Sequence, residues 1–277
     1  MLSPSRLNTA LLLALLTSPA YAESAPAPAV LDTVKVTGFP MRFKADETTT
    51  AMKTETALID VPQALSVVTE QQIEDQAMVG MADVLRYVPG AGMAQGEGHR
   101  DAPVLRGNLS TSDFYSNGIR DDAQYYRDLY NVSQVEILKG PNALIFGRGG
   151  TGGIVNRVIK EADGIDRTDF LLRAGAYGFY RVQADVGAAA DDNLAYRFNA
   201  LYENAGSFRD GVGTELAGLT PSIAFGLGAD SRMVLTAEVF RDRRTVDRGI
   251  PSFQGRPLET RRSLFFGDAA DSNASTD

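Results

Sequence analysis

The sequence predicts a two-part protein, a compact α+β region followed by antiparallel strands of a membrane-type β-barrel. Three observations carry this prediction. A signal-peptide pattern opens the chain, residues 46–163 mix helical and strand patterns, and residues 164–277 alternate polar and apolar side chains with a period of two. The alternating segments have about the ten residues of a tilted transmembrane strand. The alternatives are a soluble α+β domain for the first region and a soluble β-sandwich for the second.

Residues 1–22 have the features of a cleaved signal peptide. Arg6 precedes an apolar run over residues 10–16, and residues 20–22 (AYA) form an A-x-A cleavage pattern. The apolar run is too short to span a bilayer as a helix. We therefore expect export, with the mature chain beginning at Glu23.

Composition argues against several classes of function. The chain has no cysteine, which rules out a cysteine-anchored lipoprotein and a disulfide-stapled secreted domain. Its net charge of -8, from 27 basic and 35 acidic residues, argues against nucleic acid as a partner. A single histidine leaves protein-ligated zinc, haem or iron sites poorly supplied. We expect no directly bound cofactor, so any iron handled here has to arrive already chelated.

Short helices and strands are expected in the first region. Residues 69–76 begin with a T-x-x-Q capping box and predict a helix, and a second helix over residues 81–88 ends at Pro89. The Asn117-Gly118 pair predicts a type I′ hairpin. The expected strands are residues 64–69, 103–107, 134–140 and 154–160.

In the second region, each expected strand has an apolar face and a polar face. Residues 188–193 and 228–232 form short turns, whereas residues 205–215 and those after Arg241 form longer polar connections. Short turns on one side and long loops on the other are typical of an outer-membrane barrel. About five strands are expected, fewer than the smallest barrel needs, and residues 268–277 have the composition of the middle of a loop. We therefore expect the N-terminal part of a longer protein.

A series of motifs resembles one protein family. In order they are DTVKVTG, DVPQALSVVTEQQIEDQ, ADVLRYVPG, LRGN, SNGIRDD, VEILKGPNALIFGRGGTGGIVNRV and DRRTVDRGIPS. Together they resemble the N-terminal part of a TonB-dependent siderophore receptor, with the catecholate type most similar. The resemblance implies a 22-stranded barrel in the lipid of the Gram-negative outer membrane, closed by a plug domain (residues 46–163). It also implies import of ferric siderophores with energy delivered through TonB.

The sequence is also compatible with functions other than siderophore import. A TonB-dependent receptor for haem, cobalamin or a glycan is one alternative, and a passive or adhesive surface barrel is another. Gly147, Gly149 and Gly152 also satisfy the G-x-G-x-x-G pattern of dinucleotide-binding enzymes, but the residues that follow predict a strand where that motif needs a helix. His99 lies in a glycine-rich loop without a nucleophile elbow. We therefore expect no enzymatic activity.

The segment before the plug, residues 23–45, contains an isolated strand pattern at residues 31–38. A lone strand is marginal in water, so this one needs a partner. The resemblance identifies it as a TonB box that adds to a strand edge of TonB, and the alternative is a random tail. The residues expected to contact TonB are Asp32, Thr33, Val34, Lys35, Val36 and Thr37.

The resemblance also implies contact residues within the plug. Arg106 and Lys139 match positions where the family presents basic side chains toward glutamates of the barrel wall. Residues 95–101, 108–112 and 121–128 resemble the outward apical loops, where binding residues usually lie.

A ferric tris-catecholate is an aromatic trianion, so its site should offer cations and rings. Arg100 and Arg127 are expected to supply charge, and Tyr125 and Tyr126 to supply stacking and hydroxyl donation. A hydroxamate chelate is closer to neutral and needs the arginines less. The alternative is that these residues are solvated loop side chains.

Overall fold

The protein is described here from a computed structural model of the 277-residue chain. The described residues belong to one compact unit, residues 41–277. The expected signal peptide and TonB box lie outside the described residues. The described ranges are 43–48, 53–54, 56–95, 97–140, 146–147 and 150–277.

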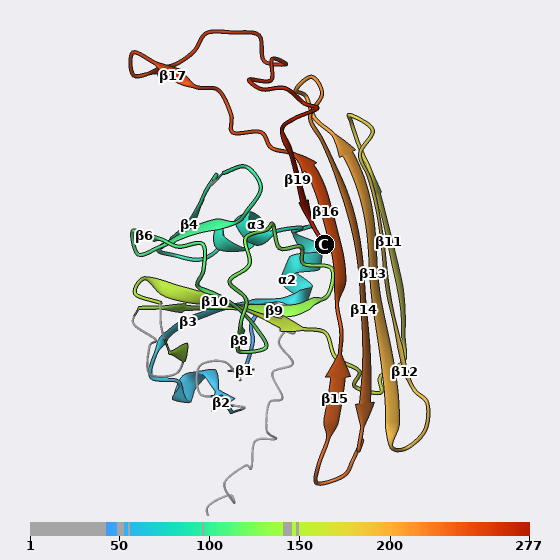
Figure 1. Cartoon of the computed structure of the whole chain (residues 1–277). Coiled ribbons are helices and arrows are strands. Elements are labelled where there is room, and N and C mark those ends of the chain that lie inside the picture. The colour runs from blue at the N-terminus through green and yellow to red at the C-terminus, as the bar shows by residue number, and fades with distance from the viewer. Residues whose placement is uncertain (1–42, 49–52, 55, 96, 141–145, 148–149) are drawn as a thin grey trace, which may run out of the picture. The chain divides into compact units, whose positions relative to one another are not determined.

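Among the described residues, a five-stranded sheet forms the centre of the plug (Figure 1). β10 pairs antiparallel with β9 and parallel with β7. Val135, Ile137 and Val155 are fully buried, so the core follows β9 and β10. In spatial order the strands are β3 (Ala64–Thr69), β9 (Val132–Lys139), β10 (Gly153–Ile159), β7 (Phe114–Ser116) and β8 (Ile119–Arg120).

Two short helices pack against this core. The first, α2 (Glu70–Asp75), begins where the backbone N–H of Gln72 donates to the Thr69 hydroxyl at 3.3 Å, in agreement with the capping pattern. The second, α3 (Met81–Leu85), buries three apolar side chains, and the chain then turns at Gly90 with a φ of 76°.

Smaller elements complete the plug. Residues 108–112, expected to be a loop, begin with a strand, β6, that pairs with β5. A local hairpin therefore forms where composition alone indicated irregular chain. The smaller elements are β1 (Glu47–Thr48), β2 (Thr56–Ala57), the 3-10 helix η1 (Leu58–Asp60), β4 (Ala91–Ala94), β5 (Ala102–Leu105) and β6 (Asn108–Leu109).

A hairpin turn and the start of β10 both depend on glycine, in agreement with the sequence. Asn117 and Gly118 have φ values of 47° and 75°, the conformation that a type I′ hairpin needs between β7 and β8. The glycine-rich segment leads into strand β10 and not into a helix, as expected. At Gly153, with a φ of 146°, an added Cβ would lie 2.3 Å from the Leu138 carbonyl oxygen. Glycine therefore allows β10 to start close against β9.

The second sheet, which we call the wall, consists of β11–β16 and β19 within the described residues. All of its pairings are antiparallel. β13 and β14 have 13 residues each, enough to cross a bilayer at a tilt. The wall strands are β11 (Arg167–Ala174), β12 (Tyr180–Ala189), β13 (Leu194–Gly206), β14 (Gly213–Phe225), β15 (Met233–Thr236), β16 (Val239–Thr245) and β19 (Asn273–Thr276).

The wall differs from the sequence prediction at its polar ends. β13 and β14 extend into residues 205–215, which shortens the expected connection, and β16 continues to Thr245. Asn273–Thr276 pairs with β16, although residues 268–277 were expected to be the middle of a loop. This strand forms through backbone pairing with β16, and its polar residues give no alternating pattern that would predict it. The long connection between β16 and β19 (residues 246–272) contains the hairpin of β17 (Ser252–Phe253) and β18 (Arg256–Pro257).

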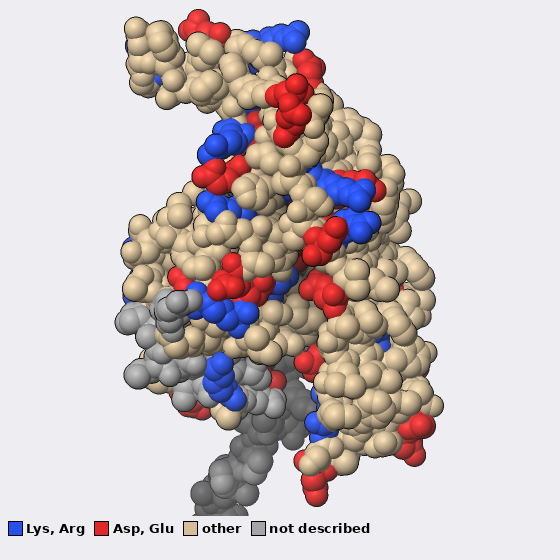
Figure 2. Space-filling view, viewed as in Figure 1, with Lys and Arg blue, Asp and Glu red and all other residues tan. Residues whose placement is uncertain are grey.

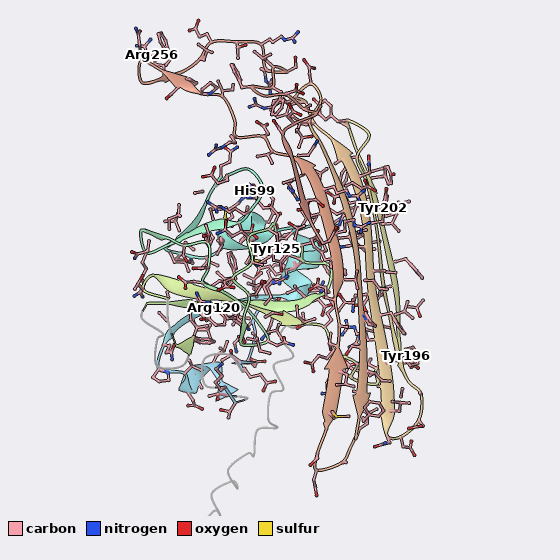
Figure 3. All side chains as sticks on the ribbon, in the orientation of Figure 1. His99, Arg120, Tyr125, Tyr196, Tyr202 and Arg256 are labelled. Atoms are coloured by element: carbon pink, nitrogen blue, oxygen red, sulfur yellow. The ribbon has the colours of Figure 1, made fainter. Side chains whose placement is uncertain are left out.

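The two faces of the wall differ in the way that alternation predicts. Phe170 and Leu172 are exposed on one face, and charged side chains of β12 and β13 are buried on the face toward the plug. Tyr180 and Tyr202 form a ring pair on the exposed face with centroids 5.9 Å apart. Figure 3 shows Tyr196 far from Tyr202 along the same sheet. An apolar face with aromatic residues near both ends is typical of a surface that contacts lipid. In the described part of the chain, none of the helices has the length and apolar character that crossing a membrane requires.

Candidate functional site

Two of the three predicted apical segments meet at one end of the plug. The backbone N–H of Asp101 donates to the Tyr125 carbonyl oxygen at 3.1 Å, and Arg100 donates to the Gln124 side chain. The Tyr126 hydroxyl donates to the Gln95 carbonyl oxygen at 3.4 Å. Residues 95–101 and 121–128 therefore form one surface, which we call the apical cluster, with His99 and Tyr125 in the same part of the plug (Figure 3).

Arg127 is the structural centre of the apical cluster. Its side chain is 1% exposed, and its guanidinium lies over the rings of Phe114 and Tyr125 at 3.8 and 4.4 Å. It donates to the carboxylate of Asp121 at 2.9 Å and to the backbone carbonyl oxygens of Asp121, Ala123 and Tyr125. A guanidinium with this many internal acceptors is not exposed to a ligand. The burial of Arg127 thus argues against the direct chelate contact expected from the sequence.

Tyr125 is also held from within the plug. Its hydroxyl donates to Asp121 at 3.0 Å and accepts from Arg157 at 2.8 Å. Burial would raise the pKa of Asp121, but the guanidiniums of Arg127 and Arg157 hold that pKa below its usual value. Burial raises the pKa of Tyr125. The hydroxyl is therefore neutral and committed to internal hydrogen bonds.

Arg100 and Tyr126 lie closer to the surface. Arg100 is 22% exposed, and the Tyr126 ring is half-buried. The guanidinium of Arg244, on β16, lies 4.3 Å from the centre of the Tyr126 ring. The wall therefore places a cation next to the apical cluster, and no sequence pattern predicts this contact. Asp242 orients this arginine by accepting from Arg244 Nε at 2.9 Å.

The contacts recorded for Arg106 and Lys139 lie within the plug. Lys139 Nζ donates to the Ser66 hydroxyl at 3.0 Å and to the Pro89 carbonyl oxygen at 3.4 Å. Arg106 has a φ of 49°, and its guanidinium lies near Gly140. The expected pairing of these two residues with wall glutamates stays a prediction.

An ion triad joins the plug to the wall. Arg181 of β12, which is 1% exposed, donates to both carboxylate oxygens of Asp128 at 2.7 and 2.8 Å and to Glu203 of β13 at 2.7 Å. Asp128 directly follows Arg127, so the segment that forms the apical cluster also contacts the wall. No local sequence pattern predicts this triad.

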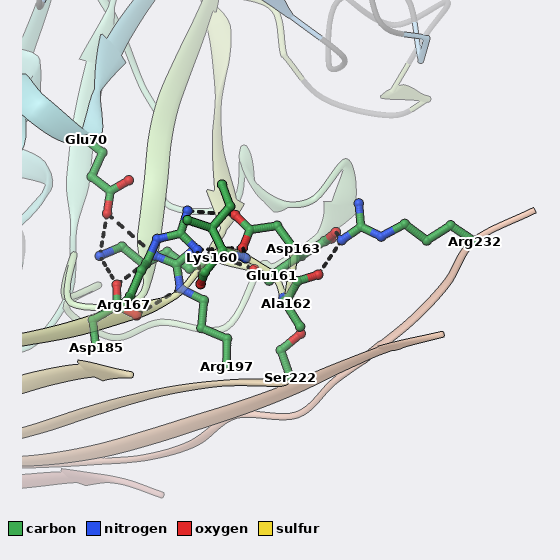
Figure 4. A network of polar contacts seen from close by, with 11 residues as sticks. Glu70, Lys160, Glu161, Ala162, Asp163, Arg167, Asp185, Arg197, Ser222 and Arg232 are labelled. Atoms are coloured by element: carbon green, nitrogen blue, oxygen red, sulfur yellow. Dashed lines mark hydrogen bonds and ion pairs between the residues drawn. The ribbon is translucent and has the colours of Figure 1, made fainter. Parts of the chain in front are cut away.

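A second network lies where the plug leads into the wall (Figure 4). Lys160 Nζ lies 2.6 Å from Glu70 and 3.0 Å from Asp185 of β12. Arg197 of β13 donates to the same Asp185 carboxylate at 2.6 and 2.8 Å. The backbone N–H of Ala162 donates to the Ser222 hydroxyl at 3.1 Å. Charges of opposite sign thus join α2, β12 and β13.

A third contact uses aromatic and amide groups of the plug. Asn131 donates to Thr220 and Glu238 at 2.9 Å, and the Tyr130 hydroxyl lies 2.7 Å from the Thr220 hydroxyl. An added Cβ at Gly218 would lie 2.7 Å from the Tyr130 ring, so glycine gives this ring its place against β14. Burial, with the nearby Glu238 carboxylate, raises the pKa of Tyr130.

A partly open pocket of about 230 Å³ lies between the plug and the wall next to the apical cluster. Its lining includes Asp101, Tyr126, Asp128, Arg181 and Arg244. Figure 2 shows basic and acidic side chains interspersed over the visible face, with no single-sign patch. Among the described residues, no group of three or more histidine or carboxylate side chains is arranged to hold a metal ion.

Comparisons with known proteins agree with this architecture. Residues 57–154 match the family described as TonB-dependent Receptor Plug Domain. The chain is 33% identical over 253 residues to the probable TonB-dependent receptor BfrD of Bordetella pertussis, covering 90% of this chain and 34% of the relative. It is 33% identical over 227 residues to the catecholate siderophore receptor Fiu of Escherichia coli O157:H7, covering 80% and 30%.

A solved structure also resembles the chain. The crystal structure of the siderophore receptor PiuA from Acinetobacter baumannii matches with a TM-score of 0.77 and 29% identity, over 84% of this chain and 35% of that chain. The chain therefore spans about a third of the length of the relatives it matches.

Proposed function

Because the chain belongs to the TonB-dependent receptors, we propose that the complete protein is an outer-membrane receptor that imports ferric siderophores with energy from TonB. The observation that carries this proposal is the seating of the plug against the polar face of the wall. The Arg181 triad and the Lys160 network join the two, while the opposite face of the wall is apolar. Such a plug blocks the barrel lumen and has to rearrange before cargo can pass.

The proposed cargo is a ferric catecholate. Catecholate oxygens carry negative charge and the rings are aromatic, so cations and aromatic side chains at the surface suit them. Arg100 and Tyr126 of the apical cluster have this character, as does Arg244 of the adjacent strand β16. The similarity to a catecholate siderophore receptor supports the same choice. Haem, cobalamin and glycans remain the alternative cargoes, and the iron itself travels as part of the chelate.

A binding titration tests the cargo. The full-length receptor is titrated with a ferric tris-catecholate and with a ferric tris-hydroxamate, using the parent, Arg100→Ala and Tyr126→Ala. Loss of a real contact should weaken catecholate binding about thirtyfold, or roughly 2 kcal/mol. Arg256→Ala, an exposed arginine on β18, is the matched control. Tight hydroxamate binding by the parent, or an unchanged catecholate affinity in both variants, refutes the assignment of a catecholate cargo.

The proposed partner is TonB, which would pair with residues 31–38 by β-augmentation. Proline at Val34 or Val36 removes a backbone donor and fixes φ, so strand addition should fail. In the complete receptor we expect import of the ferric chelate to stop while binding at the cell surface persists. Alanine at the same positions is the control, because it keeps the backbone donor. Import at the parental rate by either proline variant would contradict the coupling role.

A further inference from the structure

Glu97 lies between two arginines at the apical end of the plug. One carboxylate oxygen is 3.8 Å from an Nη of Arg100, which belongs to the same plug segment. The other oxygen accepts from Arg248, which belongs to the long connection after β16. One carboxylate therefore compensates a cation of the plug and a cation of the long connection at the same time.

The backbone around this bridge is closely packed. Gln95 Nε2 donates to the Asp247 carbonyl oxygen at 2.8 Å. Gly98 has a φ of 84°, and an added Cβ there would lie 2.9 Å from that same Asp247 oxygen. The apical cluster and the start of the long connection thus meet at a defined place, with Arg100 and Arg248 on either side of Glu97.

Arg100 is incompletely satisfied in this arrangement. Its Nε is buried and has no acceptor among the residues that the structure describes. The 3.8 Å separation from Glu97 exceeds hydrogen-bond distance, so this carboxylate supplies charge without a short contact. A buried donor without a partner is rare in folded proteins. Glu97 thus compensates Arg100 only weakly.

We propose that Glu97 is a stand-in anion that a negatively charged chelate displaces. The inference rests on the proposed function and adds the selection of cargo by charge. Negative oxygens of the chelate take the place between Arg100 and Arg248, and the Glu97 side chain turns to solvent. Arg248 then becomes a specificity-determining residue contributed by the wall side. A neutral chelate gains little from the two arginines and does not displace the carboxylate.

The test uses two substitutions with opposite expected signs. In the full-length receptor, Glu97→Gln should bind a trianionic ferric tris-catecholate about tenfold more tightly, because the competing charge is gone. Arg248→Gln should bind it about tenfold more weakly. Binding of a neutral ferric tris-hydroxamate should change by less than about twofold in both variants. An ion pair with a merely structural role would shift both variants in the same direction, since each breaks the same pair.

Glu259→Gln is the matched control, because Glu259 is an exposed carboxylate of the same connection and the net charge changes equally. Its affinity for the trianion should equal that of the parent. If the parent binds the trianion and the Glu97 and Arg248 variants change in the same direction or not at all, the inference fails by itself. If the parent does not bind the trianion, the proposed function fails and the inference fails with it.

Discussion

Replacing Arg181 with methionine tests what holds the plug against the wall. The buried guanidinium donates two hydrogen bonds to Asp128 of the plug and one to Glu203 of β13, all between 2.7 and 2.8 Å. Methionine keeps an unbranched apolar stem, so the substitution removes mainly the charge and its hydrogen bonds. Two carboxylates then face each other without a cation.

The structure gives the size of the expected effect. Asp128 is 5% exposed and keeps the Tyr130 backbone N–H as a donor at 2.9 Å, whereas Glu203 is 13% exposed and gains some hydration. Removing one partner of a buried ion pair costs about 3 to 5 kcal/mol, and the partial exposure of Glu203 favours the lower value. At about 3 kcal/mol, the open population of the plug rises roughly a hundredfold.

Hydrogen exchange of plug amides in the full-length receptor measures this opening. Arg173→Met is the matched control, because Arg173 faces the same side directly opposite Arg181 but, among the described residues, donates to the Ala77 carbonyl oxygen at 3.3 Å and to neither Asp128 nor Glu203. Adding Asp128→Asn and Glu203→Gln to the Arg181 variant should restore most of the protection. Equal protection of the parent and the Arg181 variant would refute the reasoning, as would equal losses in the Arg181 and Arg173 variants.

Three further substitutions probe single features of the plug. Burial raises the pKa of Asp101 from its usual 3.8 to about 6, against the opposing hydrogen bond from the Arg127 backbone N–H. The pKa of Asp101 is higher in the folded state than in the unfolded state. Its contribution to the free energy of unfolding is therefore complete below about pH 4, and about 3 kcal/mol of this contribution is lost as the pH rises to 6. Asp101→Asn should flatten the pH dependence of urea unfolding over that interval, and an unchanged slope would contradict the assignment. Arg127→Lys keeps the charge but loses the planar guanidinium, so the free energy of unfolding measured in urea should fall by roughly 3 kcal/mol. A fall below about 1 kcal/mol would mean that the planar guanidinium is dispensable. Gly218→Val places a side chain where the Tyr130 ring lies, which should loosen the plug against the wall. Large antibiotics should then enter cells more readily. Unchanged exclusion of these antibiotics by a folded variant receptor would argue against this close contact.

Local patterns allowed most of the element types to be predicted from the sequence. Capping at Thr69, the Asn117-Gly118 hairpin and the strand after the glycine-rich segment each depend on neighbouring residues only. Alternation likewise indicated which side chains of β12 and β13 share a face. β19 was not predictable in this way, because its partner β16 is separated from it by the long connection. Its polar residues carry no strand pattern of their own.

Partners distant in the sequence explain why the candidate site was only partly predicted. Arg127 lies in a polar segment, so its charge indicated a ligand contact. Its burial depends on Phe114 and Asp121, which only the fold brings around it. Alternation puts Arg181 on the polar face of its strand, yet nothing local identifies Asp128 as its partner. This buried ion pair leaves no spacing signal in the sequence, because its two members lie 53 residues apart and only the fold brings them together.

The chemistry of the interface between plug and wall bears on how a receptor of this kind could open. An apolar interface would gain about 25 cal/mol for every Å² removed from water, and separating it would cost that amount again. The contacts through Arg181, Lys160 and Asn131 are instead charged or polar, beside one apolar contact in which the Tyr130 ring packs against Leu201 and Leu216. Buried ion pairs add little net stability, because separated charges regain hydration, while the directional hydrogen bonds of these networks favour one seated geometry. A plug seated in this way has a fixed closed position, and water can replace its contacts one network at a time. Rearrangement during import would then cost less free energy than separation of an apolar interface of the same area.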